Sequence, residues 1–132
     1  MVEKMNKVLE KLDAQGKQVW LFAILKMDEL VDKWSLIFSA PWDNVQNRDL
    51  EFKNILSLVK EELDKEELYS IARVAFLKKE DHLVQELLKK NSGDKIDNET
   101  INGNIIHEGY VIASNADLNQ KEDKQADVKP VE

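Results

Sequence analysis

The histidines are the first side chains to consider for chemistry, because imidazole titrates near neutral pH. The chain has two, His82 and His107. His107 stands beside Glu108 in a stretch with the pattern of a β-strand, where adjacent side chains point to opposite faces. His107 is therefore a candidate catalytic acid or base only if another element brings a carboxylate to it; the alternative is a hydrogen-bonded structural histidine. No H-x-H or H-x-x-x-H spacing occurs, so we predict no metal site and no cofactor.

Acidic residues cluster between two predicted strands. Asp28 and Asp32 are four residues apart, so on a helical turn they would share a face. Paired carboxylates can hold Mg²⁺ or act as acid and base. A short acidic connection is also typical of a solvated turn. Asp28 and Asp32 are thus the carboxylates that a catalytic pocket around His107 would require.

A tryptophan follows the proline that ends a predicted strand. Trp42 comes directly after Pro41 and is followed by Asp43. Tryptophan is enriched at interface hot spots, and it also closes hydrophobic cores. Trp42 and Asp43 are therefore the candidate partner-binding residues, with packing over the core as the alternative for Trp42. Ser39 lacks a Gly-x-Ser-x-Gly context, so no nucleophile elbow is predicted.

The charge balance narrows the range of partners. The 132 residues include 26 acidic and 19 basic side chains, which gives a formal net charge of -7. Residues 115–132 carry -2 of this charge, so residues 1–114 are themselves acidic, with -5. Nucleic acids are bound by clustered lysine and arginine, whereas an acidic body attracts basic proteins. We therefore expect a basic protein partner and no nucleic acid.

Composition also bears on location. The chain contains no cysteine, which excludes a disulfide scaffold and thiolate metal clusters and fits a reducing cytosol. Its longest apolar run, residues 19–25, is far shorter than the 18 or more residues of a membrane span. The first seven residues lack the apolar core of a secretory signal. We expect a cytoplasmic protein of bacterial type that does not bind membranes.

Apolar periodicity predicts the elements that position these residues. Spacings of three and four over residues 5–12 predict a helix that ends near Gly16. Apolar stretches at 18–27 and 34–40 predict two strands, the first covered on both faces. A single helix over 18–34 fits the same periodicity and stays open as an alternative.

The clearest amphipathic helix is predicted over residues 47–63, with its apolar stripe packed on the first two strands. The stripe consists of Phe52, Ile55, Leu56, Val59 and Leu63. Asp64 followed by Glu67 has the pattern of a capping box. Residues 71–77 predict a third strand, although a helix over 65–79 fits nearly as well, and 81–90 predict a further helix.

The strongest turn signal is Asn102–Gly103, which is typical of a type I′ hairpin between a strand ending near Ile101 and another over 105–114. The polar stretch from Asn115 is predicted to be disordered. We expect one domain over residues 1–114 and a tail over 115–132. The predicted fold class is α+β or α/β, with a mixed, largely antiparallel sheet of about five strands and about three helices.

Three functions are compatible with these features. The first is a non-catalytic protein-binding module, either an accessory subunit or an acidic immunity- or antitoxin-like protein that meets a basic partner. The second is a small enzyme in which His107 and a carboxylate converge in a pocket. The third is a self-associating structural protein in which the outer strand of the final hairpin pairs with its copy. The first is favoured by the acidic excess of residues 1–114, the lack of a recognisable active-site spacing and the aromatic ring of Trp42 in a loop, although packing is the favoured role of that ring.

Overall fold

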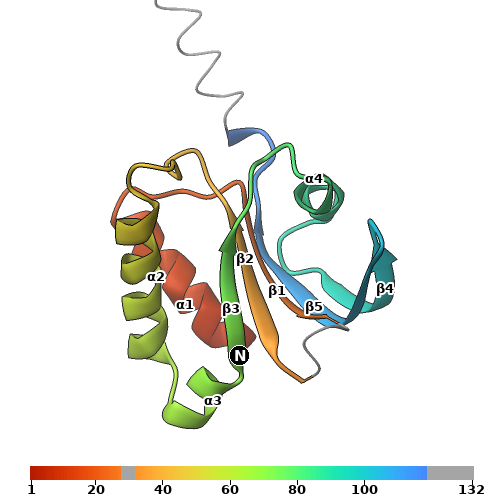
Figure 1. Ribbon diagram of the computed structural model, residues 1–132, viewed down its shortest axis with the longest axis horizontal. Coiled ribbons are helices and arrows are strands. Elements are labelled where there is room, and N and C mark those ends of the chain that lie inside the picture. The colour runs from red at the N-terminus through yellow and green to blue at the C-terminus, as the bar shows by residue number, and fades with distance from the viewer. Residues whose placement is uncertain (28–31, 119–132) are drawn as a thin grey trace, which may run out of the picture.

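The computed structural model describes residues 1–27 and 32–118. Its elements are, in chain order, α1 (Val2–Ala14), β1 (Leu21–Met27), β2 (Trp34–Ser39), α2 (Arg48–Glu62), α3 (Lys65–Tyr69), β3 (Ile71–Phe76), α4 (His82–Leu88), β4 (Lys95–Ile101) and β5 (Asn104–Ser114). The five strands form one sheet in the order β3-β2-β1-β5-β4 (Figure 1). β2 and β3 are parallel and the other neighbours are antiparallel. The predicted α+β fold with a mixed, largely antiparallel sheet is confirmed.

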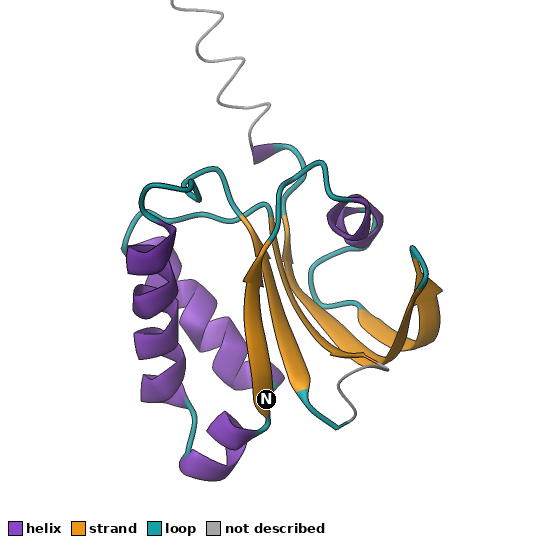
Figure 2. Ribbon diagram, in the orientation of Figure 1, coloured by secondary structure: helices purple, strands orange, loops and turns teal. Residues whose placement is uncertain are grey.

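Helices cover both faces of the sheet (Figure 2). α1 and α2 pack together on one face, and α4 lies on the other, where the β4–β5 hairpin curls toward it. Two hydrophobic cores result, one on each side. β1 lies between them and its side chains from Leu21 to Leu25 are fully buried. This double burial explains the uninterrupted apolar run of the sequence and shows that the helical alternative for 18–34 was wrong.

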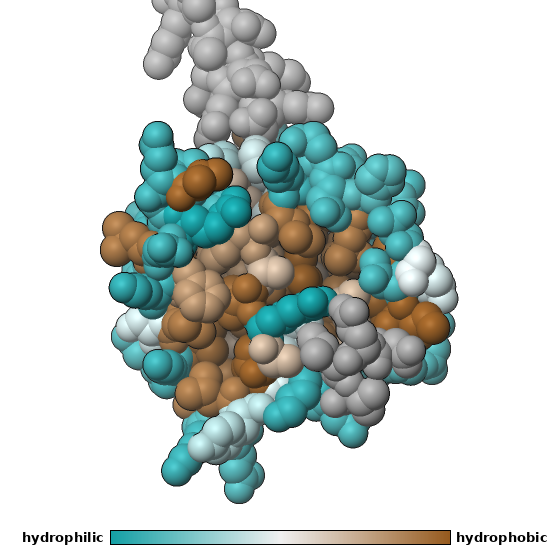
Figure 3. Space-filling view, in the orientation of Figure 1, coloured by the Kyte–Doolittle hydropathy of each residue, from teal (hydrophilic) through white to brown (hydrophobic). Residues whose placement is uncertain are grey.

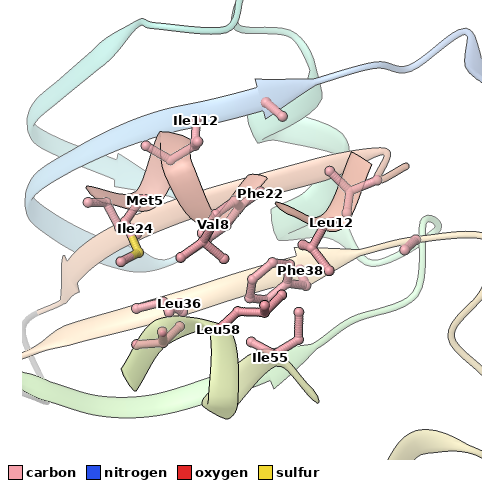
Figure 4. Close-up of a cluster of buried hydrophobic side chains, with 14 of the residues drawn as sticks. Met5, Val8, Leu12, Phe22, Ile24, Leu36, Phe38, Ile55, Leu58 and Ile112 are labelled. Carbon is pink, nitrogen blue, oxygen red and sulfur yellow. The ribbon is translucent and has the colours of Figure 1, made fainter. Parts of the chain in front are cut away.

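Aromatic rings occupy the middle of the core beneath α1 and α2 (Figure 4). Phe22 and Phe38 lie on the paired strands β1 and β2 and stack with 4.2 Å between ring centroids. Phe76 of β3 continues this row at 5.6 Å from Phe38. Met5 and Val8 of α1 point into the same core. The helix and the second strand expected from the apolar spacing therefore both contribute to this core.

Local signals at chain reversals are confirmed as well. Asp64 accepts a hydrogen bond from the backbone N–H of Glu67, whose side chain accepts one from the N–H of Asp64, so the capping box opens α3. The stretch 65–79 divides into this short helix and the strand β3. Asn102 and Gly103 have φ angles of 50° and 80°, as a type I′ turn requires.

The tail predicted from Asn115 lies mostly outside the described residues. Its first residues are part of the fold: the backbone N–H of Asn115 donates to the carbonyl of Trp20, and its side-chain amide donates to that of Val19. The chain is thereby tied to the entry of β1 as far as Leu118. Among the helices of the described residues, none has the length and apolarity that crossing a membrane requires.

Candidate functional site

The candidate catalytic residues lie toward one end of the sheet. His107 is exposed on β5, next to Ile106, which pairs with the last residue of β1, Met27. The pairing register shifts at this point, so the strict alternation of faces expected for His107 and Glu108 is interrupted by a bulge. Asp32 is exposed, with a left-handed φ of 62°. Asp28 lies outside the described residues.

These groups are not gathered into a cation site where the structure can be judged. Over residues 1–27 and 32–118, no group of three or more histidine, aspartate and glutamate side chains could hold a metal ion. The side chain of His107 is exposed, whereas a catalytic pocket would bury much of it between apolar walls. Convergence of His107 with Asp28 stays a prediction.

The candidate binding residue Trp42 is held in the fold. Its indole Nε1 donates a hydrogen bond of 2.8 Å to the carbonyl of Gln18. Its ring meets Phe76 edge-on at 6.1 Å, and the ammonium of Lys17 lies 5.7 Å from the ring centroid. Trp42 is half-buried and covers the end of the core beneath α1 and α2.

Asp43 is engaged next to it. Both carboxylate oxygens accept hydrogen bonds from Arg48, at 3.1 Å from Nε and 3.0 Å from the terminal nitrogen, and the Asp43 side chain is only 7% exposed. This pairing raises the pKa of Arg48. Because Arg48 is the first residue of α2, the ion pair ties the loop that carries Trp42 to the start of that helix.

An apolar groove lies elsewhere, at the outer edge of the sheet. It has a volume of about 230 Å³ and runs between α2 and β3. Its apolar lining includes Phe52, Leu56, Leu68, Ile71 and Val74, all half-buried. We call these five side chains, together with the unpaired backbone edge of β3, the β3 edge surface. Figure 3 shows apolar side chains gathered over α2, α3 and β3 on the face turned toward the viewer.

The width of the apolar arc on α2 explains why this groove exists. The side of α2 that packs on the sheet and on α1 buries Ile55, Leu58 and Val59. Phe52 and Leu56 were predicted to be covered too, but they lie toward the outer side, where the sheet ends at β3. The prediction that the whole stripe packs on the first two strands is therefore wrong for these two residues. Their apolar surface has no complete cover among the described residues.

The capped helix α3 forms one end of the groove. The capping box fixes the first turn of α3 and presents Leu68 to the core and to the groove. Lys33 donates a hydrogen bond of 2.7 Å to the carbonyl of Tyr69, and the backbone N–H of Trp34 donates to that of Ser70. These contacts hold the entry of β3 against β2 at this end of the groove.

The two outer strands of the sheet differ in chemistry. β4 carries Lys95, Asp97 and Glu99, and Asn98 has a positive φ of 46°. Charges and backbone irregularities on an outer strand discourage pairing with other chains. β3 has the sequence IARVAF, with one charged residue, and its pairing with β2 shifts register at Ala72, so the regular stretch is Arg73–Phe76. Of the two outer strands in the described sheet, β3 carries the fewer charges, so this stretch is the better suited to further pairing.

Ion pairs hold α1 against α2 and α3. Lys4 pairs with Glu67 and Lys11 with Glu62, the latter at 2.6 Å. The hydrogen bond from Lys11 lowers the pKa of Glu62, and that from Lys4 lowers the pKa of Glu67. The negative charges of Glu62 and Glu67 are thus partly neutralised by the lysines of α1. At the groove, the lining side chains that carry charge are basic, Lys60 and Arg73.

The β3 edge surface was missed by sequence reasoning. Its sequence signals were the two apolar residues on the outer part of the α2 stripe and the strand IARVAF with one charge. Neither signal has meaning until the strand order places β3 outermost. In comparisons with known proteins, no family model, no curated protein and no solved structure matches this chain.

Proposed function

We propose that this protein is a non-catalytic protein-binding module of the cytosol, an accessory subunit or an immunity- or antitoxin-like protein, and that it docks through the β3 edge surface. The observation that carries the proposal is the apolar groove between α2 and the outer strand β3, whose one charged side chain, Arg73, contacts Ser35 and Met27 within the sheet. Such an edge can accept a further strand by backbone hydrogen bonds, while the groove takes apolar side chains.

The net negative charge supports long-range attraction of a basic partner, in addition to the apolar contact at the groove. The net charge of -5 on residues 1–114 would attract a basic partner and speed its encounter. Lys60 lines the groove and no acidic residue of the described chain does, so a basic partner would place its charges on the surrounding surface and not in the groove. Its association should slow as salt rises from about 0.02 M to about 0.5 M, because the Debye length shortens.

Cross-linking in the native cell, with the cross-linked proteins identified by mass spectrometry, tests this function. The informative change is Leu56→Lys, which places a charge in the groove. The matched control is Leu50→Lys: Leu50 is also on α2 but is 70% exposed and does not line the groove. A protein, either another copy or a different chain, should cross-link at α2 and β3 in the wild type and the control and be lost in Leu56→Lys. Equal cross-linking in all three, or none in any, would refute the proposed function.

A further inference from the structure

The β3 edge surface has the properties of a self-complementary interface. We infer that its occupant is a second copy of this chain, bound about a two-fold axis so that β3 pairs antiparallel with β3 of the copy. This inference rests on the proposed function and names the partner at the β3 edge surface; a second copy is itself acidic, so the basic partner attracted by the net charge would be a different protein at the surrounding surface. The dimer would join two five-stranded sheets into one continuous sheet, with the two α2 helices packed side by side over the junction.

The strand sequence permits this pairing in one favourable register. In β3, Val74 and Phe76 face the core beneath α2, whereas Ala75 faces the core beneath α4. An axis through Val74 keeps these faces matched over the regular part of the strand: Val74 meets its own counterpart and Arg73 lies opposite Ala75, while the register shift at Ala72 ends the regular pairing. Apolar and small residues therefore oppose each other, and no like charges do.

Arg73 is the one charged side chain on β3, and it does not guard the edge. Its Nε donates to the Ser35 hydroxyl at 3.0 Å, and a terminal nitrogen lies 3.4 Å from the sulfur of Met27. Ser35 and Met27 belong to β2 and β1, so the guanidinium is directed back across the sheet, away from the outer side of β3. These contacts of the guanidinium are thus made within the sheet and not on the outer side of β3, where a further strand would pair.

Charges on α2 complement a second copy of the same helix. Asp49, Leu56 and Lys60 are spaced by seven and four residues and therefore share one side of the helix. In an antiparallel pair of α2 helices about Leu56, the Asp49 end of one helix approaches the Lys60 end of the other. Lys60 lines the groove and both charged side chains are exposed, so two symmetric ion pairs would flank the apolar contact.

Sedimentation velocity of the full chain, from about 1 to about 100 µM, tests the inference. We expect a concentration-dependent dimer whose dissociation constant rises at least about tenfold in Leu56→Lys and is unchanged in Leu50→Lys. Asp49→Lys and Lys60→Glu should each weaken the dimer by about threefold, the effect expected of exposed ion pairs. The double variant Asp49→Lys/Lys60→Glu should restore it, because it exchanges the two charges across the axis.

Each alternative occupant has its own outcome. A monomer at the highest concentration overturns the inference; if Leu56→Lys then still abolishes cross-linking to another protein, the proposed function stands. A monomer that dimerises only after removal of residues 119–132 also overturns it, and shows that the chain's own end fills the groove. A dimer insensitive to Leu56→Lys and to the charge exchange overturns it too, since the contact would lie elsewhere. Unchanged circular dichroism of each variant verifies the fold.

Discussion

Gly109 marks the closest approach of two strands in the centre of the sheet. It lies on β5 opposite Leu25 of β1 and Ile96 of β4. A Cβ atom at this position would be 2.8 Å from Cδ2 of Leu25 and 3.2 Å from the carbonyl oxygen of Ile24. Carbon atoms in contact normally lie about 3.5–4.0 Å apart. Gly109→Ala therefore forces Leu25 from its position or moves β1 and β5 apart.

The size of the effect follows from overpacking. One methyl group inserted into a well-packed core costs about 1–3 kcal/mol. Alanine also reduces the entropy of the unfolded chain and so returns about 0.4–1 kcal/mol. We expect Gly109→Ala to lower the free energy of unfolding by about 1–2 kcal/mol. With a urea m-value of about 1–3 kcal/mol/M, the midpoint of urea unfolding should fall measurably.

Urea unfolding followed by tryptophan fluorescence at one protein concentration measures this change. A double-mutant cycle with Leu25→Ala identifies the cause. Leu25→Ala alone costs about 2–5 kcal/mol by leaving a cavity, but it removes the side chain that the new methyl would strike. In that background Gly109→Ala should cost much less than in the wild type. If Gly109→Ala is neutral alone, or if the two costs simply add, the packing argument is incorrect.

Three further predictions concern single contacts. Trp42→Phe removes the hydrogen bond to Gln18 and should lower the free energy of unfolding by about 0.5–1.5 kcal/mol; no change in the urea midpoint would mean the indole bond is not formed. Asp64→Ala should cost about 0.5–2 kcal/mol through loss of the α3 cap, whereas Asp64→Asn should cost less, and equal costs would contradict the capping role. The pKa of Glu67 is lowered from 4.5, mainly by the hydrogen bond from Lys4. The unfolded chain then binds more protons, so this contribution is full above about pH 4.5 and is lost as pH falls through the folded pKa. Unfolding midpoints from pH 7 to 3 should show this loss in the wild type and a smaller one in Lys4→Met; parallel curves would refute it.

Elements that are buried on both faces, or that depend only on contacts within a few residues, were the most predictable from the sequence. β1 is buried by both cores, and its apolar run favoured a strand, although the helix over 18–34 stayed open until the pairing with β2 and β5 excluded it. The Asn102–Gly103 turn and the capping box depend on contacts within a few residues, and both are as predicted. Local chemistry was enough in these cases because no distant segment contributes to the geometry.

Features that depend on strand order were not predictable. β3 follows β2 through α2 and α3 as a parallel neighbour and becomes the outermost strand, which no local pattern specifies. The bulge beside His107 likewise results from the pairing of β5 with β1, so the sequence indicated alternating faces where the structure interrupts them. Asp43 was a candidate partner-binding residue, but in the structure its carboxylate is largely buried in an ion pair with Arg48. The five-residue spacing between them did not predict this ion pair.

The β3 edge surface depends on strand order in the same way, because it combines part of the α2 stripe with the outermost strand. The apolar stripe of a helix indicates which of its side chains are to be buried, but it does not indicate which element packs against them. On α2 the apolar stripe extends past the edge of the sheet, so Phe52 and Leu56 are only half-buried. Burial in the core of a single chain does not explain why these two positions are apolar. A solvated face would favour charged side chains there, as β4 has at the opposite edge. α2 therefore exposes apolar side chains beside an outer strand whose one charged side chain contacts residues within the sheet. Exposed apolar patches of this kind are typical of surfaces that bind another protein.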